Sequence, residues 1–398
     1  MGISREILAL SEKYRDLTAR NLSEVVQIPS LSGEEGDVIA KLAEQCTNAS
    51  FDEVRIDGLG NLIGRVGNGP KILAIDAHID TVDTGEIDQW DFDPFCGKIQ
   101  DGKVLGRGTV DQSGGAAAMI TAGRILKEMD YSGEYSILFT FTVMEEDCDG
   151  LCWNYIIECE KIRPEIVIIT EPTNLGLYRG HRGRMEIECY FDGLSCHGSA
   201  PERGDNAIYK ASRAALEIEK LNELLRIDEF LGKGTVTATF IESKSPSLCA
   251  VSDWSHFHLD RRLTWGETKD SAITEVRKAV GPDAAIEIPI YDKKSYKGTV
   301  FEQEKYFPTW KLPEDNIFVQ MGIAAHEALF GSKPRVDKWT FSTNGIAICG
   351  VHGIPCIGFG PGNEVFAHAP NEAVEIDHLV AAAAFYAMYP VILEEKSI

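Results

Sequence analysis

The chain has 398 residues, of which 44% are apolar and 25% charged, so it is long enough for two domains with separate hydrophobic cores. Its 62 acidic residues outnumber its 39 basic ones, which argues against partners that need clustered lysine and arginine, namely nucleic acid and anionic membrane surfaces. Its ten cysteines are dispersed, with no signal peptide before them, which predicts reduced thiols and a cytoplasmic protein. No apolar run reaches about 18 residues, so no transmembrane helix is expected.

The first part of the chain alternates strand-like and helix-like segments after a charged, helix-periodic stretch over Met1–Leu22. The predicted elements are, in order, a hairpin over Glu53–Val66, a strand over Lys71–Ala77, a helix over Ser113–Lys127, a strand over Tyr135–Val143, a helix over Leu151–Glu160 and a strand over Glu165–Thr170. Such alternation predicts an α/β sheet with helices on both faces. In sheets of this kind the reactive groups lie at the carboxyl ends of the strands.

The pattern changes after Pro172 and returns near Phe307. Between them the predicted elements are a strand over Arg184–Phe191, a helix over Asn206–Leu225, strands over Thr235–Glu242 and Trp254–Leu263, a helix after Glu267 and a strand over Ala285–Tyr291. That order is typical of a ferredoxin-like α+β unit. The elements that follow are a helix over Glu314–Phe330, a strand over Cys356–Phe359 and a closing helix over Ile376–Tyr389. We therefore predict an α/β domain of residues 1–178 and 301–398, interrupted by a second domain of residues 179–300.

His78 and Asp80 are two residues apart at the end of the first buried strand, so their side chains leave the same face. A metal-binding imidazole usually donates its second N–H to a carboxylate, and this pair fits that arrangement. On its own, a histidine beside acids is more often a satisfied polar pair than a metal site. Asp111, at a glycine-rich strand-to-helix turn, likewise allows two interpretations, a metal ligand or a helix cap.

Acidic residues also follow two further strands, and a histidine follows a glycine-rich loop over Gly358–Gly362. Glu145 and Glu146 are neighbours with side chains on opposite sides, so one is available as a metal ligand and the other as a base; an exposed acidic turn is the alternative. Glu171 closes the next strand, and His368 comes after the loop. Imidazole and carboxylate ligands without thiolates favour zinc, and five of them with one bridging carboxylate suit two zinc ions about 3.5–4 Å apart.

Seven motifs spread over nearly the whole chain resemble those of the dizinc family that contains aminoacylase, acetylornithine deacetylase, succinyl-diaminopimelate desuccinylase and glutamate carboxypeptidase. The motifs are, in order, HID, GRGTVDQSGG, EED, EPT, HGSAPERG, DRRLT and FGPGNEVFAHAPNE. The segments YFPTWKLPEDN, SPSLCAVSD and KWTFSTNG are similar to a bacterial branch described as selenium-metabolism-linked hydrolases. The resemblance implies a zinc-peptidase-like, three-layer αβα catalytic domain with an inserted ferredoxin-like lid that also forms a dimer.

Carried over residue by residue, the resemblance implies a site with two divalent metal ions, zinc above all, with cobalt and manganese as alternatives. His78 and Glu171 would bind one ion, and Glu146 and His368 the other. Asp111 would bridge the two ions, and the peptide bond that follows it is expected to be cis.

The same resemblance implies the residues that act on the substrate. Glu145 would be the general base for a metal-bridged water, and Asp80 would orient His78. His197 would stabilise the oxyanion and Arg262 would hold the substrate carboxylate, as cationic donors can. In some relatives this histidine reaches the site of the neighbouring subunit.

Two segments depart from the pattern of the family. Ser247–Ser252 stands where relatives often have Asn-Val-x-Pro, so the substrate contact made by that segment is not carried over. Ser342–Ile346 stands where several relatives have Asp-Gly-Arg, which leaves Asn344 as the substrate-binding candidate there. The missing arginine predicts a pocket that is not built for a second carboxylate, which disfavours succinyl and glutamyl substrates.

The sequence thus favours a dinuclear-zinc hydrolase that cleaves the amide bond of a small N-acyl or N-carbamoyl amino acid. A metallo-dipeptidase or aminopeptidase is the enzymatic alternative, and a non-catalytic binding protein that has kept the fold is the alternative from another class. The expected partners are this small molecule or a short peptide, and a second copy of the chain, with no nucleic acid and no membrane. The homodimer is expected to form through the inserted domain, by its helix Asn206–Leu225 and an edge strand.

Overall fold

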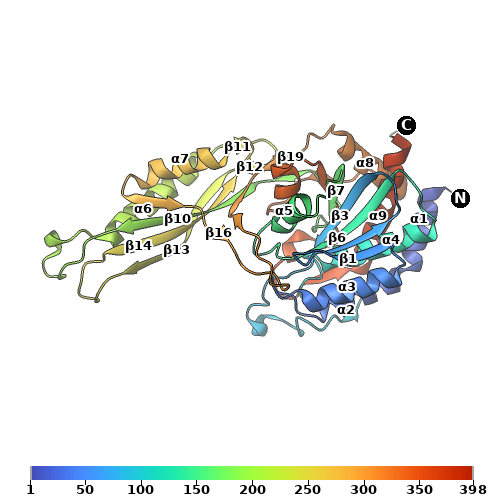
Figure 1. Ribbon diagram of the computed structural model, residues 1–398, viewed down its shortest axis with the longest axis horizontal. Coiled ribbons are helices and arrows are strands. Elements are labelled where there is room, and N and C mark those ends of the chain that lie inside the picture. The colour runs from blue at the N-terminus through green and yellow to red at the C-terminus, as the bar shows by residue number, and fades with distance from the viewer. Residues whose placement is uncertain (1, 397–398) are drawn as a thin grey trace.

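The computed structural model describes residues 2–396, and it shows an elongated molecule in which a slender arm projects from a larger body (Figure 1). The arm contains α6, α7, β10, β13 and β14, all of them from the predicted insertion. The helices at the two ends of the described chain lie in the body, on the side away from the arm.

The body is built on a mixed sheet, whose strand order within the described residues is β1-β2-β6-β3-β7-β21-β8-β20. Its strands are β1 Glu53–Ile56, β2 Leu62–Val66, β3 Lys71–His78, β6 Tyr135–Thr142, β7 Ile166–Ile169, β8 Leu177–Tyr178, β20 Val336–Asp337 and β21 Cys356–Gly358. β3 pairs in parallel with β6 and β7, and β7 pairs in parallel with β21. The carboxyl ends of these four strands therefore meet at one edge. β6 and β7 are buried along their whole length, as central parallel strands are.

The helices of the body pack on this sheet and on one another. They are α1 Ile3–Lys13, α2 Arg15–Val26, α3 Gly36–Asn48, α4 Ser113–Glu128, α5 Leu151–Glu158, α8 Ile317–Phe330 and α9 Ile376–Lys396. By length and composition α9 could cross a membrane, but 72% of its most apolar window is buried inside the molecule. It packs against α4, α8 and α1, so in this fold it is a core helix.

The arm has its own antiparallel sheet in the order β13-β14-β10-β15, with two helices packed on each other. Its elements are β10 Gly183–Asp192, α6 Ala207–Leu224, β13 Thr235–Lys244, β14 Trp254–Leu263, α7 Lys269–Val280 and β15 Ala284–Glu287. This order is that of a ferredoxin-like unit. A hydrophobic core separate from that of the body includes Phe191, Phe257 and Val276. One more short strand, β18 (Tyr306–Phe307), pairs with β10.

The remaining elements are short. The strands are β4 Ile99–Gln100, β5 Lys103–Leu105, β9 Gly180–His181, β11 Ile227–Asp228, β12 Gly232–Lys233, β16 Ile290–Tyr291, β17 Gln303–Glu304, β19 Trp310–Lys311 and β22 Ala373–Glu375. The 3-10 and π turns are η1 Ile87–Gln89, η2 Pro201–Arg203, η3 Ile346–Val351 and η4 Glu364–Phe366. β9 pairs with β19 where the chain leaves the body for the arm and where it returns.

The structure confirms the predicted α/β fold and its inserted ferredoxin-like unit, and it differs from the predicted elements in places. Met1–Leu22 was predicted as one helical stretch, but the described part forms two helices that meet at Tyr14. The closing helix runs past Pro390, because Ile392 and Leu393 beyond the proline are still buried in the core. The domain boundaries stay a prediction, although β18 joins the arm's sheet after residue 300.

A buried histidine lies where the arm meets the body. His181, on β9, is fully buried; its Nε2 accepts hydrogen bonds from Trp310 Nε1 (2.8 Å) and from the backbone N–H of Thr343 (3.1 Å). Its Nδ1 lies 2.8 Å from the carbonyl oxygen of Arg182 and donates to it. Nε2 also lies 3.0 Å from the hydroxyl oxygen of Thr343, so the neutral ring is held by polar neighbours at both nitrogens. Burial lowers the pKa of His181 to about 4.

We expect His181 to make folding less favourable in mild acid. Below pH 6.5 the unfolded chain takes up a proton on this imidazole and the folded chain does not, so stability falls as the pH drops from about 6.5 to about 4. Between pH 7 and pH 5 the loss should be about 2 kcal/mol. Urea unfolding at both pH values checks this when wild type is compared with His181→Gln, whose pH dependence should lack that loss. Parallel pH dependences for the two proteins would contradict the expectation.

Candidate active site

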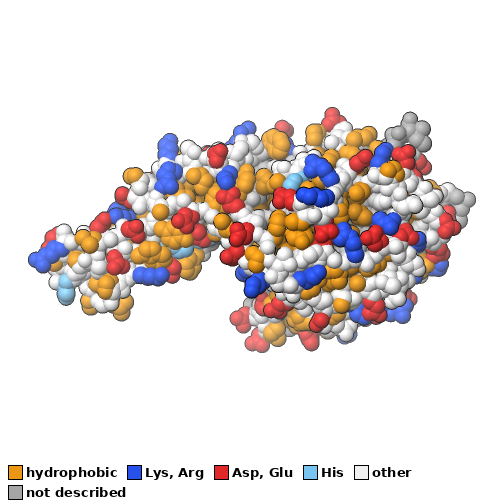
Figure 2. All heavy atoms as spheres, in the orientation of Figure 1, with side chains coloured by type: hydrophobic (Ala, Val, Ile, Leu, Met, Phe, Trp, Pro, Cys, Tyr) orange, Lys and Arg blue, Asp and Glu red, His pale blue; other side chains and the backbone are white. Residues whose placement is uncertain are grey.

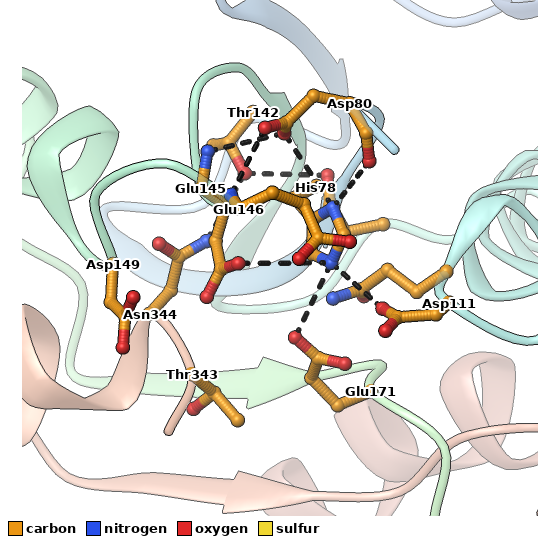
Figure 3. A network of polar contacts seen from close by, with 12 residues as sticks. His78, Asp80, Asp111, Thr142, Glu145, Glu146, Asp149, Glu171, Thr343 and Asn344 are labelled. Carbon is orange, nitrogen blue, oxygen red and sulfur yellow. Dashed lines mark hydrogen bonds and ion pairs between the residues drawn. The ribbon is translucent and has the colours of Figure 1, made fainter. Parts of the chain in front are cut away.

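Polar side chains from several strand ends converge on His78, the last residue of β3 (Figure 3). Its Nε2 lies 3.0 Å from Asp111 Oδ1, 3.5 Å from Glu171 Oε1 and 3.9 Å from Glu145 Oε2. All four side chains are buried. Asp111 comes from the turn before α4, Glu145 from the loop after β6 and Glu171 from the end of β7. The parallel strands therefore bring together residues that are far apart in the sequence.

A second histidine completes the cluster. His368 Nε2 lies 3.1 Å from both carboxylate oxygens of Glu146 and 3.2 Å from Asp111 Oδ2. Asp111 therefore directs one oxygen toward His78 and the other toward His368. This is the arrangement expected of a carboxylate that bridges two metal ions. The peptide bond Asp111–Gln112 is cis, as the resemblance implied.

The donor set fits divalent metal ions. Ligand atoms of His78, Glu145 and Glu171 lie within 4.8 Å of one another, as do those of His78, Asp111 and Glu146. Glu171 Oε2 and Glu145 Oε1 are buried and have no hydrogen-bond partner among the described residues. A buried carboxylate oxygen without a partner is costly, and a cation would satisfy that of Glu171. Nitrogen and oxygen donors without thiolate match zinc and related ions.

The electrostatics of the cluster also favour added positive charge. Burial raises the pKa of Glu145 and of Glu171, because charged carboxylates are poorly solvated there. For His78 burial acts in the opposite direction, but hydrogen bonds with Asp111 and Asp80 outweigh it and raise the pKa of the imidazole. The carboxylates that favour a proton on this histidine would equally favour a divalent cation beside it.

Buried carboxylates hold the loop that carries Glu145 and Glu146. Asp80 accepts hydrogen bonds from the backbone N–H of Glu145 (3.1 Å) and of Glu146 (3.0 Å). Glu35, which is fully buried, accepts one from the backbone N–H of Met144 (3.0 Å). Three successive amides are thus fixed by side chains. Asp80 also lies 3.5 Å from His78 Nδ1, while its backbone oxygen is closer, at 2.9 Å.

A third buried carboxylate holds the turn that carries Asp111. Glu372 Oε1 accepts from the backbone N–H groups of Val110 (2.7 Å) and Asp111 (3.1 Å), and its Oε2 accepts from Arg107 Nη1 (2.7 Å). The sequence analysis did not single out Glu372, although it belongs to the motif that contains His368. Its position in that motif was the only available signal, because the residue is 261 positions away from its partner Asp111 in the chain.

The cluster lines a cavity of about 290 Å³, small enough for a compact substrate. Besides the six residues of the cluster, it is lined by Asp149, Arg184, Arg262, Ser342 and Glu364. Among the described lining residues six carboxylates face two arginines, an excess of negative charge that two divalent ions would cancel. Arg262 lies in this cavity, as predicted, and Asp260 holds its guanidinium through Nε (2.7 Å) and Nη2 (2.9 Å).

His197 does not line this cavity. It lies on an exposed loop of the arm, where it lines a separate hollow with Tyr209, Arg213 and Leu248. Its Nδ1 accepts a hydrogen bond from the backbone N–H of Ser199 (3.1 Å). A single chain therefore does not bring His197 to the cluster, and its predicted catalytic role would need a second chain.

The predicted substrate-binding residue Asn344 lies inside the protein, behind the cavity. Asn344 is 1% exposed and does not line the cavity, because all of its amide groups are engaged inside the protein. Its Nδ2 donates to Asp76 Oδ2 (2.9 Å) and Thr142 Oγ1 (3.2 Å). Its Oδ1 accepts from the backbone N–H of Gly150 (3.0 Å) and from the thiol of Cys152 (3.1 Å). Asn344 therefore supports the site from behind, and Ser342 is the residue of this segment that reaches the cavity.

We expect Asn344→Leu to lower stability without changing substrate affinity. The substitution removes the hydrogen bonds of Asn344 to Asp76 Oδ2 and to the Gly150 N–H in the core, at a cost of about 2–4 kcal/mol. Chemical denaturation measures this loss, and KM should stay the same because no substrate contact is removed. Thr142→Val, which removes only one of the bonds to Asn344, should cost about 1 kcal/mol. A large rise in KM at unchanged stability would restore Asn344 as a substrate contact.

Comparisons with known proteins agree with this geometry. The model of the peptidase family M20/M25/M40 matches residues 74–390. The chain is 51% identical over 387 residues to the protein YgeY of Escherichia coli (strain K12), covering 96% of both. It is 29% identical over 325 residues to an acetylornithine deacetylase of Klebsiella pneumoniae (strain 342), covering 79% of this chain and 78% of that protein. The fold is similar to that of aminopeptidase PepT from Bacillus cereus ATCC 10987, with a TM-score of 0.73 and 22% identity over 96% of this chain and 99% of that one.

Proposed function

The chain belongs to the peptidase family M20/M25/M40 and is therefore a metal-dependent hydrolase of amide bonds, and we propose that it removes the acyl or carbamoyl group from a small amino acid. The observation that carries this proposal is the cluster itself, in which Asp111 faces both histidines and Glu145 stands beside them. The similarity to a protein named acetylornithine deacetylase favours deacylation over peptide cleavage. The cavity of about 290 Å³ suits a compact substrate.

In this proposal the five ligands divide as the resemblance implied. His78 and Glu171 would hold one ion, Glu146 and His368 the other, and Asp111 both. Two divalent ions, zinc in the proposal, would polarise the scissile carbonyl and make water more acidic. Three buried carboxylates keep the ligands in position, because they accept hydrogen bonds from the backbone of the loops that carry the ligands. They are Asp80, Glu35 and Glu372.

Glu145 is the proposed general base. Its Oε1 is buried without a hydrogen-bond partner among the described residues, so it is free to take a proton from the attacking water. Burial raises the pKa of this carboxyl group, which suits a residue that must hold the proton and then pass it to the leaving nitrogen. Arg262 would bind the substrate carboxylate, with Asp260 fixing the direction of its guanidinium.

A substrate screen tests the proposed activity. Protein reconstituted with zinc, cobalt or manganese is offered N-acetyl amino acids, N-carbamoyl amino acids and dipeptides. Cleavage within the first two groups is the expected result. Broad cleavage of dipeptides with no action on the other two would establish the peptidase alternative. Protein that binds no metal and shows no change on Glu145→Ala would instead be a binding protein.

The proposal includes a cytoplasmic location, which the ten free cysteines support.

It also includes a homodimer that forms through the arm. Among the described strands β13 has a neighbour on one side only, and its side chains Phe240 and Ile241 are more than half exposed. Figure 2 shows apolar side chains along this edge of the arm. On the adjacent helix α6, Tyr209 and Leu216 are also exposed. Pairing of this edge with a second copy would cover these side chains and offer His197 a route to the partner's site.

We expect Ile241→Lys to turn the dimer into a monomer, because a charge would be buried where two edges meet. Sedimentation velocity measures the mass of the species in solution. The matched control is Ile99→Lys, on an exposed strand of the body, which should remain dimeric. Activity should fall with dissociation if His197 serves the partner's site. A wild-type protein that sediments as a monomer at all concentrations would contradict this proposal.

A further inference from the structure

An ion pair inside the cavity has no part in the roles assigned so far. Arg184 Nη2 lies 2.8 Å from Asp149 Oδ1, and the hydroxyl of Ser342 donates to Asp149 Oδ2. All three residues line the cavity that holds the cluster. Asp149 and Ser342 belong to loops of the body, whereas Arg184 lies at the start of β10 in the arm. The pair therefore joins the two parts of the molecule at the site itself.

The pair is fixed in place but is not saturated. The Asp149 side chain is 6% exposed and that of Arg184 is 17% exposed, and the guanidinium lies over the ring of Phe307 at 4.7 Å from its centre. Each carboxylate oxygen has two acceptor positions, so Asp149 can accept more than its two present partners supply. Arg184 Nη2 is close enough to Asp149 for an ion pair, but neither Nη2 nor Nε is oriented to form a hydrogen bond with any described residue. Both residues therefore retain hydrogen-bonding capacity at the cavity.

The second arginine of the cavity lies directly beside the first. Arg184 and Arg262 occupy facing positions on β10 and β14, so their side chains leave the same face of the arm's sheet. Asp260 takes two N–H groups of Arg262 in a bidentate pair, which leaves Arg262 for the substrate carboxylate of the proposed function. Asp149 offsets the charge of Arg184. Both arginines are paired with an aspartate, but Asp149 lines the cavity and Asp260 does not. Arg262 therefore presents a positive charge to the cavity, whereas the Arg184–Asp149 pair presents a donor and an acceptor together.

A nearly neutral pair of donor and acceptor selects among acyl groups. A carboxylate, as in a succinyl group, would be repelled by Asp149. The methyl group of an acetyl substrate would shield Asp149 from water without donating a hydrogen bond to it. Binding of the acetyl substrate is therefore unfavourable at this contact. A carbamoyl group, H₂N–CO–, has the shape of an acetyl group and carries an N–H donor for Asp149 in place of the methyl. Its oxygen is an acceptor for donors such as the guanidinium.

We propose that Asp149, fixed by Arg184 and Ser342, is a specificity-determining contact that accepts a hydrogen bond from the amino group of an N-carbamoyl substrate. This inference rests on the proposed hydrolysis and narrows it from acyl or carbamoyl amino acids to carbamoyl amino acids. Ser342, which donates to the same carboxylate, belongs to the segment that departs from the pattern of the family.

The test compares two substrates that differ only by NH₂ against CH₃, the N-carbamoyl and N-acetyl derivatives of one amino acid. Wild type should favour the carbamoyl compound by about 10- to 100-fold in kcat/KM, the size expected for a hydrogen bond to a charged group. Asp149→Ala should bring this ratio close to one, and Arg184→Met should lower it. Asp149→Asn, which keeps the shape and one acceptor oxygen, should retain part of it. Metal content should stay unchanged in all three variants.

Arg182→Met is the matched control, because Arg182 is two residues from Arg184 but donates to the carbonyl oxygen of Lys233, outside the cavity. Its ratio of kcat/KM between the carbamoyl and the acetyl compound should equal that of wild type. A wild-type ratio of one or below, or a ratio unchanged in Asp149→Ala, would overturn the inference. A loss of kcat/KM that is equal for both substrates would show that the ion pair only supports the fold.

A binding measurement separates this inference from the proposed function. Dissociation constants of the two compounds are measured on zinc-loaded Glu145→Gln protein, alone and combined with Asp149→Ala. If wild type hydrolyses neither compound but the carbamoyl compound still binds more tightly through Asp149, the proposed hydrolysis fails and the contact stands. If both bind equally, the contact fails whatever the hydrolysis result.

Discussion

Replacing Glu145 by glutamine is expected to lower kcat by about 10²- to 10⁴-fold, the usual contribution of a positioned general base. Glutamine keeps the shape of the side chain but cannot take a proton from water. The backbone N–H of residue 145 would still bond to Asp80, so the loop and the neighbouring ligand Glu146 should stay in place. Steady-state kinetics on the best substrate of the screen measures the effect.

The metal content of the same variant is its control. Glu145→Gln protein should bind as much zinc as wild type, measured by elemental analysis after dialysis. Asp147→Asn, on the same loop but bonded to Tyr291 and Lys293 at its surface, should keep nearly full activity. A Glu145→Gln variant with full activity would exclude this residue as the base. A variant that loses metal would identify Glu145 as a ligand instead.

Replacing His78 by alanine should remove one metal ion per chain and lower kcat/KM by about 10³-fold, equivalent to several kcal/mol of lost transition-state stabilisation. His78 Nε2 is the nitrogen nearest to Glu171 and to Asp111 Oδ1, so the ion held by these residues would lose its only imidazole. The ion held by Glu146 and His368 should remain. Elemental analysis and zinc titration distinguish one ion from two.

Asp83→Asn is the matched control for His78→Ala. Asp83 is exposed and five positions further along the chain. Among the described residues its carboxylate accepts one local hydrogen bond, from the backbone N–H of Gly85. Both metal ions and the activity should be retained in this variant. A His78→Ala protein that keeps two ions would mean that the histidine does not bind metal.

Most of the fold was predictable because its elements are long and their patterns are local. β3, β6 and β14 lie almost where the apolar runs placed them, and the parallel strands then force their polar ends to one edge. That is why the cluster around His78 could be predicted before any contact was known. The family resemblance, which the M20/M25/M40 match confirms, assigned a role to each of its members.

The parts that could not be predicted depend on contacts over long distances in the chain. Ser342 and Asp149 are 193 positions apart, and Arg184 lies near them because β10 begins where the chain leaves the body for the arm. Asn344 was assigned by its place in a motif, but the chain turns there into the π-helix η3, which draws its amide into the core. His197 was assigned by its place in a motif, but its loop lies in the arm and lines a hollow separate from the cavity.

The separation of body and arm has a consequence for how selectivity can change. The proposed metal ligands and base lie on residues before 172 and after 367, whereas Arg184 and Arg262 come from the inserted segment between them. Substitutions at Arg184 or Arg262 can therefore alter the lining of the cavity while the proposed metal ligands and base stay untouched. Asp149 and Ser342, by contrast, lie on the body, so the two parts of the molecule can change the same cavity independently.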